Sequence, residues 1–113
     1  MKPSEVLEKA AELIEPEGAW TRQFYARTAS QMPVLEIDDD AACWCALGAI
    51  GRACGRVFNH GNEGDLPLVC ETYLRAAIDG RSVPSWNDEP ERTQSEVVAA
   101  LRKAAELARS EGQ

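Results

Sequence analysis

The tripeptide Cys43-Trp44-Cys45 carries the residues of this sequence that are best suited to chemistry. A cysteine thiolate is a nucleophile, and a helix N-terminus lowers the pKa of a thiol beside it. The second predicted helix of the chain would place Cys43 within its first turn. The sequence has one histidine, His60, in a glycine-rich stretch, and Asn87 follows later. One candidate function is therefore a small cysteine-dependent hydrolase that uses Cys43 or Cys45 with His60.

The order of Cys43, His60 and Asn87 is similar to that of papain-like cysteine peptidases, and the pair Cys43-Trp44 resembles a dipeptide of that family. This resemblance implies that Cys43 and His60 would act as nucleophile and base. The nearby aspartates at positions 38–40 oppose this chemistry, because negative charges raise the pKa of a thiol. The alternative is that the cysteines serve as small buried apolar residues, which we favour strongly for Cys54 and Cys70.

We expect neither a metal ion nor another cofactor. Zinc sites use Cys-x2-Cys pairs or a comparable cysteine and histidine spacing. On a helix, Cys43 and Cys45 would point about 200° apart and could not face one ion. In a cytoplasmic protein the four cysteines are expected to remain free thiols.

Charge excludes some classes of partner. Acidic residues outnumber basic ones 19 to 12, and the net charge is −7. Binding through phosphates requires a basic face, so we expect neither direct nucleic-acid binding nor docking on anionic lipid. No membrane-spanning run or signal peptide is recognisable, which predicts a cytoplasmic protein. The acidic surface predicts a protein partner instead, and the oligomeric state stays open. The candidate partner-binding residues are Asp38, Asp39, Asp40, Glu63, Asp65, Trp86 and Asp88.

Hydrophobic periodicity predicts a mostly α fold with four helices in a single domain that spans residues 1–113. The expected helices are Ser4–Glu15, Asp40–Cys54, Asp65–Ile78 and Gln94–Ser110. Between the first two, Ala19–Asp40 combines aromatic and turn residues without a helical period, which predicts a small β-hairpin.

Local signals add detail to this plan. The aspartates before the second helix are expected to cap it. Thr93 and Glu96 form a capping box before the last helix. Gly48 and Gly51 would weaken the second helix unless another backbone packs closely against it. The long connection before the last helix requires a buried anchor, for which Trp86 is suited.

Several strings along the chain resemble an uncharacterised family of small bacterial and phage proteins. They are Cys43-Trp44-Cys45-Ala46-Leu47-Gly48-Ala49-Ile50, Trp86-Asn87-Asp88, the helix start at Thr93 and the opening Ile14-Glu15-Pro16-Glu17-Gly18-Ala19-Trp20. The resemblance covers most of the chain. It implies a phage or prophage association and no particular activity.

The acid excess and the resemblance together favour a small acidic interaction protein of phage type. One version is an inhibitor of a host nucleic-acid-handling or defence complex, which occupies a basic nucleic-acid site as some anti-CRISPR proteins do. Two alternatives remain, namely the cysteine-dependent hydrolase and a structural or packaging adaptor.

Overall fold

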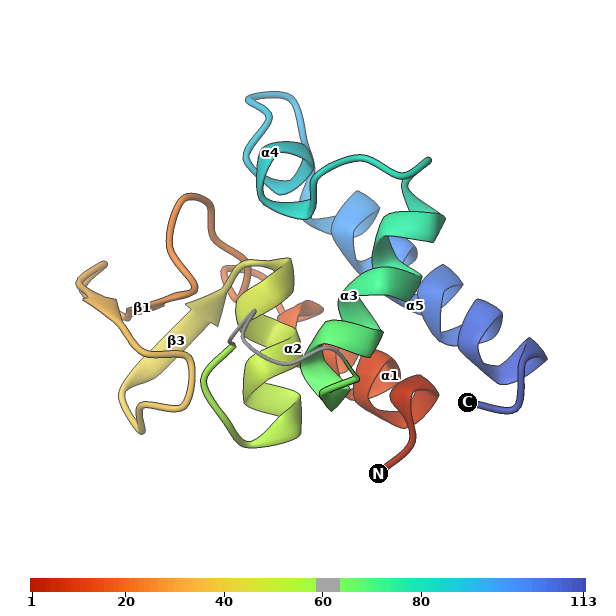
Figure 1. Ribbon diagram of the computed structural model, residues 1–113. Coiled ribbons are helices and arrows are strands. Elements are labelled where there is room, and N and C mark those ends of the chain that lie inside the picture. Colours follow the sequence, from red (N-terminus) through yellow and green to blue (C-terminus); the bar gives the residue numbers. More distant parts are fainter. Residues whose placement is uncertain (59–63) are drawn as a thin grey trace.

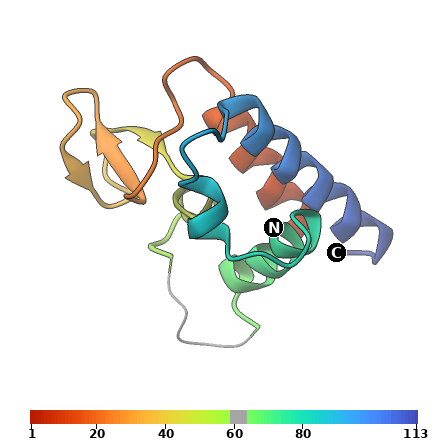
Figure 2. The same ribbon diagram turned by 90° about the horizontal axis from the view of Figure 1, so that it is seen from above.

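Two long helices from opposite ends of the chain pack against each other in the computed structural model, which describes residues 1–58 and 64–113. They are α1 (Pro3–Ile14) and α5 (Gln94–Ser110), and both views show them side by side (Figures 1 and 2). They run antiparallel, since Ser4 Oγ donates to Gln113 O at one end and Gln94 Nε2 donates to Ile14 O at the other. Their buried residues repeat at helical spacing, as the sequence predicts.

Two further helices complete the helical body. α2 (Ala46–Cys54) packs against α1, α3 and the short α4 (Val83–Asn87), and α3 (Leu66–Ala77) packs against α5 and α1. Seven of the nine residues of α2 are buried. Asp65 is the N-cap residue of α3, and Thr93 and Glu96 form the predicted capping box of α5. No helix within the described residues is long and apolar enough to cross a membrane.

A small antiparallel sheet projects from the helical body (Figures 1 and 2). Its strands are β1 (Ala26–Thr28), β2 (Pro33–Val34) and β3 (Ala41–Trp44), in the order β2-β1-β3. We call residues 24–44, which contain the three strands and their connections, the sheet lobe. The predicted hairpin consists of β1 and β2. Pro33 lies on the edge strand, where the lack of a backbone N–H donor is tolerated.

The predicted start of the second helix at Asp40 is wrong. Residues 41–44 form β3, whose Trp44 pairs with Ala26 of β1, and α2 begins only at Ala46. The aspartates therefore do not cap a helix. Asp38 instead closes a turn by accepting the Asp40 N–H at 2.7 Å. Pairing with a distant strand overrides the local helical pattern here.

Residues 1–58 and 64–113 contain five helices rather than the predicted four. The additional one is α4 (Val83–Asn87), which lies within the connection predicted as a loop from Arg81 to Arg92. Trp86 of α4 is 7% exposed, and the Arg92 guanidinium lies 4.1 Å from the centre of its ring. The expectation that Trp86 anchors this connection is thus confirmed.

Candidate functional site

The strings Cys43-Trp44-Cys45 and Trp86-Asn87-Asp88 meet at the N-terminus of α2. The buried Asn87 side chain joins them. Its Oδ1 accepts the Ala46 N–H at 3.1 Å and the Trp20 indole N–H at 2.9 Å. Its Nδ2 donates to Thr21 O and to Asp88 Oδ1 at 3.2 and 3.0 Å. Asn87 therefore ties α4 to α2 and to the segment before β1, and its amide is fully occupied by structural hydrogen bonds.

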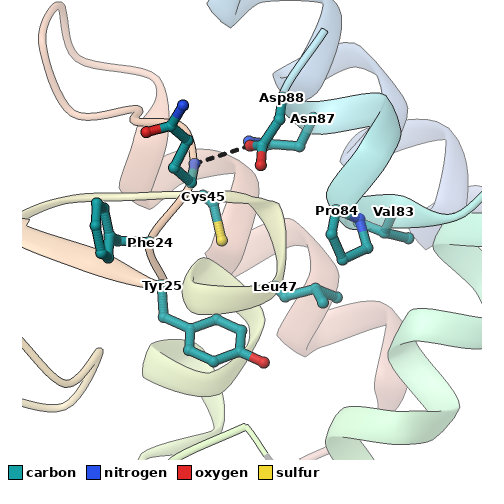
Figure 3. Close-up of a pocket in the computed structure, with 9 residues that line it drawn as sticks. Phe24, Tyr25, Cys45, Leu47, Val83, Pro84, Asn87 and Asp88 are labelled. Carbon is teal, nitrogen blue, oxygen red and sulfur yellow. Dashed lines mark hydrogen bonds between the residues drawn. The ribbon is translucent and has the colours of Figure 1, made fainter.

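A pocket of about 380 Å³ opens beside this junction (Figure 3). We call it the Cys45 pocket, because the Cys45 sulfur points into it. Aromatic and aliphatic side chains form most of its walls, and polar groups lie on one side. Its volume falls within the range of small-ligand and side-chain pockets. The lining residues are Gln23, Phe24, Tyr25, Cys45, Leu47, Val83, Pro84, Asn87 and Asp88.

Cys45 is the N-cap residue of α2. Its Sγ accepts the Gly48 N–H at 3.3 Å, and its own N–H donates to Tyr25 O at 3.2 Å. Burial raises the pKa of this thiol to about 11, although the N–H groups of the helix N-terminus act in the opposite direction. The negative charges of Asp88 and Glu36 raise this pKa further. Cys45 is therefore a neutral thiol at pH 7.

Among the described catalytic candidates, Cys43 does not share a site with Cys45. Cys43 lies in β3 and not in the first turn of a helix, because that turn does not exist. Its thiol is buried and donates to Arg27 O at 3.7 Å, outside the Cys45 pocket. His60 lies outside the described residues, as does Glu63. Of the three catalytic candidates within the described residues, the structure brings Cys45 and Asn87 to one place.

Asp88 is the predicted partner-binding residue that lies in the pocket. Its Oδ1 accepts the Gln23 N–H at 2.9 Å as well as the Asn87 amide. Within the described ranges 1–58 and 64–113, no basic side chain forms an ion pair with Asp88. Among the described residues, its carboxylate is thus without a basic partner.

The other predicted partner-binding residues lie on different elements. The aspartates at positions 38–40 lie in the turn that leads into β3, Asp65 starts α3, and Trp86 is buried in α4. The described part of the chain holds no group of three or more histidine, cysteine, aspartate or glutamate side chains that could bind a metal ion.

Sequence reasoning missed most of the pocket walls. Phe24 and Tyr25 belong to an aromatic stretch without a helical period, which signalled only an irregular segment. Val83 and Pro84 lie in the helix that was predicted as a loop. Gln23, which precedes the two aromatic residues, has a φ of 72° in the left-handed region, and its residue type gave no sign of this.

Alkylation kinetics test the state of the Cys45 thiol. We expect iodoacetamide to modify Cys45 at pH 7 about 100-fold more slowly than a free thiol, because a pKa of about 11 leaves little thiolate. The rate should increase as the pH rises toward 11. Peptide mapping by mass spectrometry reads each cysteine separately. Rapid modification of Cys45 in the folded protein at pH 7 would contradict the raised pKa and favour a nucleophilic role.

Comparison with known proteins identifies one matching family. The sequence pattern of a family of unknown function, DUF6197, matches residues 1–107. No curated protein and no solved structure matches the chain. The matched region includes the whole Cys45 pocket and both strings that meet there. The chain therefore belongs to DUF6197, a family of unknown function.

Proposed function

We propose that this chain is a binding protein that holds a basic side chain of a protein partner in the Cys45 pocket. One observation carries the proposal: an apolar pocket includes a single carboxylate, that of Asp88, which no basic side chain neutralises in the described part of the chain. The apolar walls favour a hydrocarbon stem, and the carboxylate favours a cation at its end. A lysine or arginine side chain combines the two.

The neutral groups in the pocket suit binding better than catalysis. Burial raises the pKa of Tyr25, as it does that of Cys45, so both side chains are uncharged at pH 7. The hydrolase alternative needs a thiolate near neutral pH, and the raised pKa of Cys45 opposes it. Neither the hydrolase nor the adaptor alternative has a specific observation in its favour.

A protein is a better partner than a small cationic molecule, because apolar surface extends beyond the pocket. Phe24 and Tyr25, which line the pocket, are 40% and 38% exposed. Met32, Leu35 and Ile37 of the sheet lobe are also exposed. Exposed apolar side chains at the rim of a pocket are typical of protein-binding surfaces.

Charge favours one class of partner. The net charge of −7 favours a partner with a basic surface. Such a surface is typical of a nucleic-acid-handling or defence complex, so an inhibitor of phage type would suit it. Complementary charges should make association weaken as the salt concentration rises.

Selection from a displayed library of random peptides tests the proposal. We expect enrichment of peptides in which a lysine or arginine lies next to apolar residues. Asp88→Asn should weaken their binding about tenfold or more, because it removes the charge and keeps an oxygen for the Gln23 N–H. Asp39→Asn removes one exposed charge of the sheet lobe and serves as the matched control, with little effect expected.

The outcomes distinguish the pocket from general acidity. Equal losses for Asp88→Asn and Asp39→Asn would show that only overall charge matters. Selected peptides without basic residues would contradict the proposed partner chemistry. Affinity that does not change between low and high salt would remove the electrostatic part of the proposal.

A further inference from the structure

Arg27 of β1 carries a positive charge that forms no ion pair within residues 1–58 and 64–113. Its side chain is half-buried, and its guanidinium lies 4.7 Å from the centre of the Phe24 ring. An arginine has five N–H donors. Within the described residues, Arg27 donates one hydrogen bond from its side chain, from Nη2 to Arg22 O at 3.4 Å, and its buried Nε has no partner. The fold therefore holds this cation in place without supplying it with an anion.

One peptide group connects Arg27 with Asp88, the carboxylate of the Cys45 pocket. The Arg22 carbonyl accepts the hydrogen bond from Arg27, and the Gln23 N–H of the same peptide group donates to Asp88 Oδ1 at 2.9 Å. The C=O and N–H of a trans peptide point in opposite directions, so the two charged groups lie at opposite ends of this group. The two hydrogen bonds and the bonds of the peptide group limit the distance between Arg27 Nη2 and Asp88 Oδ1 to about 9 Å or less.

Phe24 links both charges to one apolar surface. Its ring lines the Cys45 pocket, as Asp88 does (Figure 3), and the Arg27 guanidinium lies over the same ring. Partial burial reduces the competition from water, so an anion at Arg27 would be bound more strongly than at an arginine on the open surface. A ligand that fills the pocket and covers Phe24 would therefore meet a negative charge and a positive charge.

We propose that Arg27 binds a carboxylate of the same partner segment whose basic side chain enters the Cys45 pocket. This inference rests on the function proposed for that pocket and names the second charge that the partner must carry. A guanidinium binds a carboxylate through directional, charge-assisted N–H···O bonds. In an extended segment, residues two apart point to the same side and lie about 7 Å from each other, a spacing that the arrangement of Arg27 and Asp88 accommodates. The partner motif is thus a lysine or arginine with an aspartate or glutamate two residues away.

Three synthetic peptides test the proposal by calorimetric titration of the native chain. All contain one arginine among apolar residues and have blocked, uncharged ends. The first has a glutamate two residues from the arginine on each side, and the second has glutamines there. The third has the glutamates six residues from the arginine, about 20 Å away in an extended segment. We expect the first peptide to bind about fivefold or more tightly than either of the others.

Variants of the chain identify the group that reads the carboxylate. Arg27→Gln removes the positive charge and retains a side-chain N–H donor. It should abolish the preference for the first peptide and leave the affinity for the glutamine peptide within about twofold of the native value. Lys103→Gln removes an exposed positive charge of α5 and is the matched control, which should keep the preference. If Arg27→Gln does not fold, the comparison of the three peptides on the native chain still decides.

The outcomes separate this proposal from the function of the Cys45 pocket. Equal affinities of the first two peptides, both weakened by Asp88→Asn, would overturn the role of Arg27 and leave the pocket's function intact. An equal loss for all three peptides in Arg27→Gln would also overturn it, because Arg27 would then only support the pocket. Failure of all three peptides to bind would overturn both proposals.

Discussion

Gly48→Ala is expected to lower the free energy of unfolding by about 3 kcal/mol or more. A Cβ at this position would lie 1.9 Å from the Tyr25 carbonyl oxygen and 2.7 Å from its carbon. That carbonyl is held by the Cys45 N–H, so it cannot move without disrupting the start of α2. Urea denaturation of the native chain and the variant measures the loss.

Gly51→Ala is the matched comparison within the same helix. A Cβ there would lie 2.9 Å from Arg56 O and 3.0 Å from the Glu36 side chain, so a small shift relieves most of the contact. We expect a loss of about 1 kcal/mol. Gly48→Ala with stability near that of the native chain, or the reverse ranking of the two variants, would contradict the close packing of Tyr25 on α2.

Asn87→Ala is expected to lower the free energy of unfolding by about 3–5 kcal/mol. The substitution leaves three groups without this partner, namely the Trp20 indole N–H, the Ala46 N–H and the Thr21 carbonyl. Each buried polar group that loses its only partner costs about 1–3 kcal/mol. Thermal or urea unfolding followed by circular dichroism measures the effect.

Trp20→Phe provides the control, because it removes only the indole N–H from this set. Its loss should be smaller, at about 1–2 kcal/mol. A neutral Asn87→Ala would mean that the amide does not tie the two strings together. In that case Asn87 would be available for another role, including the catalytic one that its place in the sequence suggested.

The sequence predicted best where the decisive interactions are local. The α5 capping box lies within four residues, and its expected hydrogen bonds between Thr93 and Glu96 are present. The start of α3 after its N-cap residue Asp65 is equally local. These features depend on neighbours in the chain, so residue type alone was informative.

Prediction failed where distant segments decide. β3 forms because Cys43 and Trp44 pair with Arg27 and Ala26, a contact that no local pattern reveals. The N-cap residue of α2 is Cys45. Cysteine is not a common N-cap residue, so the sequence gave no recognisable signal for the start of this helix. The five-residue α4 was too short for its periodicity to be recognised.

The candidate site was likewise predicted only in part from the sequence. Cys45, Asn87 and Asp88 were named from their motifs, but their roles differ from a catalytic set. Asn87 is held by four hydrogen bonds, and burial raises rather than lowers the pKa of Cys45. A prediction of these roles would have required the burial and the hydrogen-bond partners, both of which depend on the tertiary fold.

The most direct test of the central claim is an NMR titration of the native chain with the n-butylguanidinium cation. Neutral n-butylurea, which has the same shape and no charge, is the comparison ligand. We predict that the cation shifts the amide signals of Tyr25, Cys45 and Leu47 at several-fold lower concentration than the urea does. This preference should be lost in Asp88→Asn and retained in Asp39→Asn. Equal effects of the two ligands on the native chain, or no shift around the Cys45 pocket, would contradict the claim that this pocket holds a basic side chain.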